Sequence, residues 1–154
     1  MCSSDLEAVG DRRCLAEALR NLGTVFLKLD DYGKALEYSS RALEVAREVG
    51  ARGMVGMAER NLGEVFSRTL FDDLATRDAR IEQAAGHFEA SIRELEAIGS
   101  TAELGKSLLA HGSFLAELGR VEASRAQLER ARDLFQRLDM RDNLERTERV
   151  LAVL

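Results

Sequence analysis

Apolar positions recur with helical spacing along the chain. Leu19, Leu22 and Phe26 stand at i, i+3 and i+7, so they share one face of a helix. A polar break follows at Asp30–Asp31. A second apolar face then continues to Gly50, a residue suited to the left-handed conformation that ends many helices. This pattern predicts two amphipathic helices joined by a short turn.

The same unit returns further along the sequence. RNLGTVF at 20–26 reappears as RNLGEVF at 60–66, which is 40 residues later, and a looser copy places Gly112 a further 49 residues on. The glycine that closes the second helix keeps the same two intervals, at Gly10, Gly50 and Gly99. Two independent markers with one irregular spacing indicate an internal repeat.

These residues resemble the tetratricopeptide repeat, and in particular its 40-residue variety. Its Leu-Gly, aromatic and Ala positions are matched by Leu19, Leu22, Gly23, Phe26, Ala35 and Ala42, then by Leu62, Gly63, Phe66, Ala84 and Phe88, then by Leu108, Gly112, Leu115, Leu128 and Ala131. The chain departs from the pattern at Ser39, Glu59, Ser91, His111 and Ser124, and it lacks the closing Pro. The resemblance implies a right-handed α-solenoid with a concave binding face.

We therefore expect an all-α fold of about three stacked helix-turn-helix repeats and a C-terminal capping helix. The beginning of the chain looks like the end of a second helix, so we expect a piece cut from a longer bacterial protein, with a frayed half-repeat as the alternative. The expected divisions are a remnant of a preceding helix at 1–10, repeats at 11–50, 51–99 and 100–139, and the capping helix at 140–154.

The second repeat carries nine extra residues, which lie within 67–83. Nine residues correspond to about two and a half helical turns, so longer, projecting helices would absorb them. Leu70, Phe71 and Leu74 would line that projection. They either pack on each other or form a hydrophobic contact for a partner. We expect this irregular middle unit to be the main source of specificity.

The face opposite the apolar side of each first helix would line the concave surface. The predicted groove residues are Arg20, Asn21, Thr24, Lys28, Met57, Arg60, Asn61, Glu64, Arg68, Lys106 and Ser113. The whole strip carries five cations and three acids on a chain of net charge −5, which favours an acidic peptide. The family resemblance implies that Asn21 and Asn61 bind the backbone of a bound peptide.

Composition narrows the function. The chain has no Pro, few aromatic residues and a net charge of −5, which together favour helices and give no support to nucleic-acid binding. No apolar run is long enough for a membrane span, and we expect a cytoplasmic protein. Arg greatly outnumbers Lys, as in GC-rich bacterial genomes. The sequence shows no catalytic constellation, phosphate loop or metal-ligand spacing, so we expect no enzyme, cofactor or metal.

The leading interpretation is a scaffold that binds a protein or peptide partner, as the sensory or scaffolding part of a bacterial signalling or regulatory protein. The alternative is a self-assembly module that forms homo-oligomers through an exposed N-terminal face or through the 70–74 segment.

Overall fold

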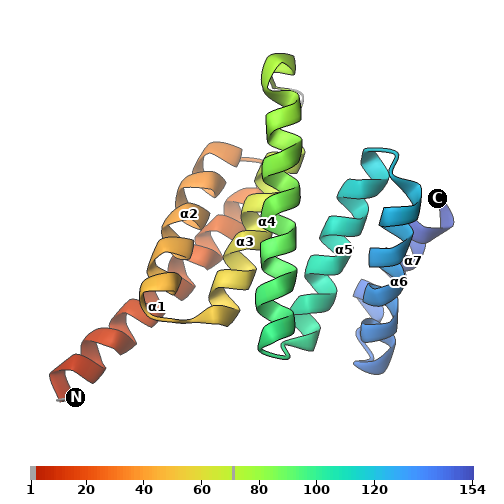
Figure 1. Cartoon of the computed structure of the whole chain (residues 1–154). Helices are drawn as coiled ribbons and strands as arrows, with labels where there is room; N and C mark the ends of the chain where they lie inside the picture. The colour runs from red at the N-terminus through yellow and green to blue at the C-terminus, as the bar shows by residue number, and fades with distance from the viewer. Residues whose placement is uncertain (1–2, 71) are drawn as a thin grey trace.

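The computed structural model describes residues 3–70 and 72–154, which form seven α-helices and one short 3-10 helix. Successive helices pack as antiparallel pairs, α1 with α2, α3 with α4 and α5 with α6, and α7 packs on α6 (Figure 1). The predicted fold class, an all-α stack of helix pairs, is confirmed. The elements are α1 (Ser3–Lys28), α2 (Tyr32–Glu48), α3 (Arg52–Arg68), η1 (Leu74–Thr76), α4 (Arg77–Ala97), α5 (Thr101–Glu117), α6 (Val121–Arg137) and α7 (Arg141–Ala152).

The turns form where the sequence predicts them. Asp30 adopts a left-handed backbone with φ 57°, and the Asp31 carboxylate caps α2 by accepting the backbone N–H of Lys34 at 3.1 Å. Gly50 ends α2 with φ 67°. Its lack of a Cβ makes this conformation inexpensive, as the sequence pattern indicates.

The helix end expected at Gly10 is absent, because α1 runs without interruption from Ser3 to Lys28. A glycine inside a helix costs only about 1 kcal/mol, and the residues after it are compatible with continuing the helix. Arg12 also pairs with Glu48 on α2, which ties this early part of α1 to its neighbour. Residues 3–10 are therefore the first part of α1 and not a separate helix.

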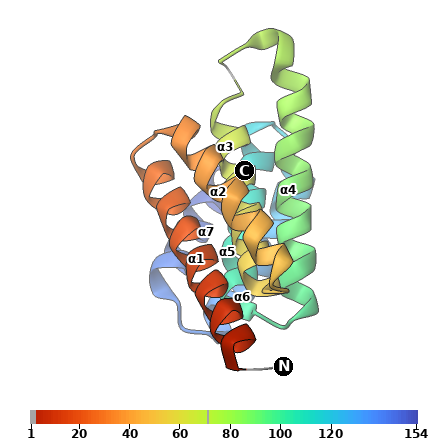
Figure 2. The ribbon, with the colours of Figure 1, turned by 90° about the vertical axis from the view of Figure 1, so that its left-hand side faces the viewer.

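The extra residues of the second pair form a loop with the 3-10 helix η1 and a longer α4, which spans 21 residues and projects beyond its neighbours (Figures 1 and 2). The prediction of two longer helices is therefore only half right. Leu70 is 2% exposed and packs with Ala84, Phe88 and Phe114, so it is unavailable as an outer contact. Leu74 is 76% exposed, and Phe71 lies outside the described residues.

The core lies between the helices of each pair and between successive pairs. Phe88 and Phe135 are almost completely buried, and each ring packs against one glycine of the facing helix, Phe88 against Gly63 on α3 and Phe135 against Gly105 on α5. The first helices of the pairs also contact one another, α1 with α3, α3 with α5, and α5 with α7. This row of four helices forms the wall of the candidate site.

Candidate functional site

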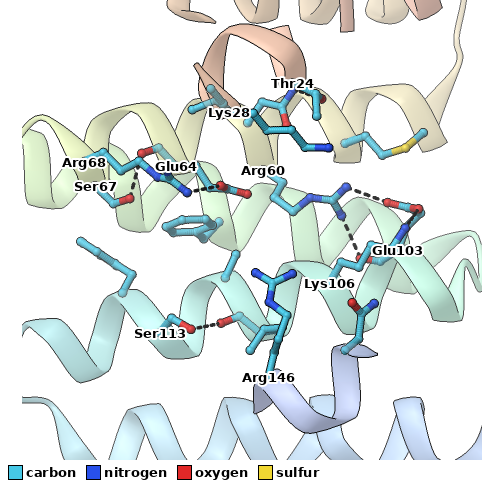
Figure 3. A pocket seen from close by; sticks show the side chains of 18 of the residues that line it. Thr24, Lys28, Arg60, Glu64, Ser67, Arg68, Glu103, Lys106, Ser113 and Arg146 are labelled. Atoms are coloured by element: carbon cyan, nitrogen blue, oxygen red, sulfur yellow. Dashed lines mark hydrogen bonds and ion pairs between the residues drawn. The ribbon is translucent and has the colours of Figure 1, made fainter. Parts of the chain in front are cut away.

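A groove of about 650 Å³ lies along α1, α3, α5 and α7 (Figure 3). Ten of the eleven groove residues predicted from the sequence line it, and Asn21 does not. The groove also takes in side chains that the sequence analysis omitted, chiefly Glu103 on α5 and Asn143 and Arg146 on α7. Its lining is Arg20, Thr24, Leu27, Lys28, Met57, Arg60, Asn61, Glu64, Ser67, Arg68, Phe88, Glu103, Lys106, Leu109, Ala110, Ser113, Phe114, Glu117, Asn143 and Arg146.

The groove is basic although the whole chain is acidic. Six of its lining side chains are cationic and three are acidic, which leaves a charge of +3 against −5 for the chain. The additional cation, Arg146, comes from the helix that the sequence analysis treated only as a cap. A local excess of one sign in a concave surface raises the local concentration of oppositely charged ligands.

Arg60 is committed to holding α3 against α5. Its guanidinium donates to the Glu103 carboxylate at 2.7 Å, to the Glu103 backbone carbonyl at 3.1 Å and to the Ser107 hydroxyl at 3.2 Å. Lys106 donates to the other Glu103 oxygen at 2.8 Å. Burial alone would raise the pKa of Glu103, but Arg60 and Lys106 outweigh it and lower that pKa, so the carboxylate stays ionised.

Asn61 is also committed within the fold. It is 4% exposed, and its side-chain amide donates to the Thr24 hydroxyl at 3.1 Å and to the Arg20 carbonyl at 3.4 Å. This amide joins α3 to α1. Its nitrogen is therefore not free for the peptide-binding role that the family resemblance implies for Asn61.

Asn21 does not behave as the equivalent of Asn61. It is exposed, and its side-chain oxygen accepts a hydrogen bond from its neighbour Arg20 at 2.7 Å. The described part of the chain has no helix beyond α1 for Asn21 to reach. The repeated sequence position therefore supplies an inter-helix bond only where a preceding helix stands beside it.

Three groove cations have no carboxylate partner among the described residues: Arg20, Lys28 and Arg146. Figure 3 shows Lys28 near α1 and Arg146 reaching in from α7 on the opposite side. The buried Nε of Arg20 also lacks a hydrogen-bond partner. Arg68 differs, because it stands 3.5 Å from Glu64 and 3.6 Å from Asp30.

Apolar side chains complete the groove between these charges. Leu27, Leu109 and Phe114 are each less than a tenth exposed and line it together with the partly buried Met57. Ser113 turns its hydroxyl back to the Leu109 carbonyl at 2.8 Å, so it presents little free hydrogen-bonding capacity. The surface combines an apolar base with basic ends.

A second polar cluster lies outside the groove and was missed by the sequence analysis. Glu59 is 3% exposed and contacts His87 at 2.5 Å and Arg47 at 2.8 Å, and the His87 ring stacks on Phe66. The only signal in the sequence was the departure of Glu59 from the repeat pattern. The carboxylate is satisfied from two helices and joins α2, α3 and α4.

His111, which stands beside Gly112 on α5, is an interior residue. It is 6% exposed and stacks on Phe88, but its Nδ1 is buried without a partner. Burial lowers the pKa of His111, and the nearby Glu89 opposes that shift only in part. In the described residues no three His, Cys, Asp or Glu side chains group as metal ligands, and no helix has the length and apolar character of a membrane span.

Comparison with known families gives one result. Residues 10–72 match the tetratricopeptide repeat family. The matched segment covers most of α1, all of α2 and α3, and the start of the following loop. None of the curated proteins compared with this chain matches it. Tetratricopeptide repeats are in general protein–protein interaction modules, and helices α4 to α7 continue the same antiparallel pairing beyond the match.

Proposed function

We propose that this chain is a protein-interaction module whose groove binds an acidic peptide segment of a partner protein. The observation that carries the proposal is the set of three cations, Arg20, Lys28 and Arg146, that line the groove without a carboxylate partner among the described residues. The other charges of the wall largely neutralise one another. A ligand with negatively charged groups can form charge-assisted hydrogen bonds with these three side chains without breaking an existing ion pair.

The apolar base adds a second requirement. The partly buried Met57 offers apolar surface that gains free energy when it is covered, whereas Leu27, Leu109 and Phe114 are already less than a tenth exposed and add little. A peptide that alternates acidic and large apolar side chains would satisfy both parts of the groove. We further infer that this chain is the sensory or scaffolding part of a bacterial signalling or regulatory protein, which stays a prediction from the sequence.

A labelled peptide tests this proposal directly. Fluorescence anisotropy would compare a fluorescein-labelled peptide of Glu and Leu with the same peptide in which Lys replaces Glu. We expect the Glu peptide to bind and the Lys peptide not to bind. Binding should weaken as salt rises, because exposed ion pairs are screened at higher ionic strength.

Variants locate the site. Lys28→Glu and Arg146→Glu together should weaken Glu-peptide binding by about tenfold, because each reversal removes an attraction and adds a repulsion. Arg41→Glu together with Arg137→Glu is the matched control, since both arginines are exposed, on α2 and α6, outside the groove, and the double reversal changes the net charge by the same amount. Equal affinities for the groove and control variants, or equal binding of both peptides, would overturn the proposal.

A further inference from the structure

The outer face of α1 carries an apolar stripe that no part of the described chain covers. Leu15 is 41% exposed, Leu22 40%, Val25 48% and Leu29 67%, and Ala18 is exposed between them. We call these five residues the α1 stripe. Leu19, which lies one helical turn after Leu15, is instead 4% exposed and packs in the core.

The spacing within the α1 stripe indicates what kind of partner it fits. Its members are separated by 3, 4, 3 and 4 residues, which is the a and d pattern of a heptad repeat. A seam of this period matches the side-chain rows of another α-helix over about 21 Å. Figure 2 looks onto this end of the molecule, where α1 lies at the front beside α2.

The opposite end of the molecule has a different character. The inner face of α7 packs Leu144, Val150 and Leu151 on the α6 cluster. Its outer positions are charged and exposed, and they include Arg141, Asp142, Glu145, Glu148 and Arg149. If the N-terminal end of one copy stacked on the C-terminal end of another, these charges would be buried against an apolar surface that offers them no hydrogen-bond or ion-pair partner. Burying charges in this way costs free energy.

The charge of the stripe favours pairing with itself. A two-fold contact brings the same surface of both copies together, so like charges on that surface would repel. The stripe is uncharged, and Cys14 and Asn21, which flank its middle on the side away from the core, are also uncharged and exposed. The nearest exposed charges on this surface, Asp11 and Lys28, lie at its two ends, so the central part from Cys14 to Val25 can meet an identical surface without repulsion.

We propose that the α1 stripe is a homodimer interface in which two copies of this chain pack α1 against α1. The contact leaves the groove outside the seam, since the groove wall of α1 is formed by Arg20, Thr24, Leu27 and Lys28. The proposal does not depend on the proposed function of the groove. Because the seam is only two heptads long, the dimer should be in measurable equilibrium with the monomer.

Sedimentation equilibrium of the full chain over a concentration series tests the proposal. The parent should shift from monomer to dimer, and Leu22→Glu should remain a monomer over the same range. Leu74→Glu is the matched control, because Leu74 is an exposed apolar residue away from the stripe, and it should dimerise like the parent. Far-UV circular dichroism would check folding, and Val25→Glu replaces Leu22→Glu if that variant does not fold.

Each remaining outcome is decisive. A parent chain that stays monomeric at every concentration overturns the proposal. A dimer that survives both Leu22→Glu and Val25→Glu also overturns it, because the contact would then lie on another face. Peptide affinity measured on the monomeric variant should equal that of the parent, which separates this test from that of the groove.

Discussion

Replacing Gly63 by alanine tests the packing of α3 on α4. A Cβ at this position would stand 2.8 Å from the Phe88 Cδ1 and Cε1 atoms and 3.0 Å from Cγ, well inside normal contact. The ring cannot easily move away, because it is 1% exposed and the rings of His111 and Phe114 lie 5.6 Å from it. The new methyl group therefore overpacks the core.

Two effects compete in this variant. Glycine to alanine inside a helix ordinarily stabilises by about 1 kcal/mol. Overpacking a rigid core costs about 1–3 kcal/mol, and the enclosed ring of Phe88 places this site near the upper end. We expect Gly63→Ala to lose about 1–2 kcal/mol of unfolding free energy, which corresponds to a Tm lower by about 3–6 °C.

Gly86→Ala provides the matched control, because Gly86 lies inside α4 and its Cβ would meet no atom within 4 Å. This variant should gain about 1 kcal/mol from helix propensity alone. Guanidinium unfolding followed by far-UV circular dichroism would measure both variants and the parent. If Gly63→Ala gains as much stability as Gly86→Ala, the close contact with Phe88 does not limit the packing and the reasoning is wrong.

Three further changes have definite expected outcomes. His111→Leu should make the Tm less dependent on pH. Because the pKa of His111 is lowered in the folded state, the stability that the neutral histidine contributes to the parent is complete above its ordinary pKa and is lost as pH falls through the folded-state pKa. Thermal melts at a series of pH values would compare the variant with the parent. Ser39→Ala should stabilise by about 1 kcal/mol because its buried hydroxyl has no partner, whereas Ser124→Ala should destabilise by about as much because its hydroxyl donates to a buried carbonyl at 2.7 Å; chemical unfolding compares the two. Glu103→Gln should lose about 1–2 kcal/mol of unfolding free energy at pH values above the ordinary pKa of Glu. The loss should be smaller in acid, because the parent's own carboxylate is protonated as pH falls through its lowered folded-state pKa. Anisotropy should show tighter Glu-peptide binding, because the variant removes the charged partner of Arg60.

The helices and their faces follow from periodicity, because one apolar face of each helix must be buried. The spacing of Leu19, Leu22 and Phe26 predicted the second half of α1 and its turn, although Leu22 is 40% exposed and lies on the outer face rather than in the core. Gly50 marked the end of α2 as predicted. The opposite arc located the groove, and all but one of its predicted residues line it. The helix faces and the groove-lining positions could be predicted because both follow from the spacing of residues along a helix.

What the sequence could not show is which polar groups satisfy each other. Arg60 and Asn61 lie on the groove side of α3 as predicted, yet both side chains form hydrogen bonds with neighbouring helices, Arg60 with α5 and Asn61 with α1. Gly10 matches the closing glycines in sequence, yet α1 continues through it, because glycine permits a left-handed backbone without requiring one. Leu70 lies in the segment that was predicted to project, but it is buried by residues on α4 and α5.

Because the groove side chains of the middle unit are used in inter-helix hydrogen bonds, we no longer expect this unit to be the main source of specificity. Its conspicuous groove residues, Arg60 and Asn61, hold α3 to α5 and to α1, so they fix the shape of the groove. The unpaired cations lie at the edges of the row, with Arg20 and Lys28 on α1 and Arg146 on α7. A ligand that contacts both edges must span the groove, and its affinity depends on the separation of α1 from α7. Because α3 and α5 set that separation, a change at Arg60 should alter binding through geometry as well as charge.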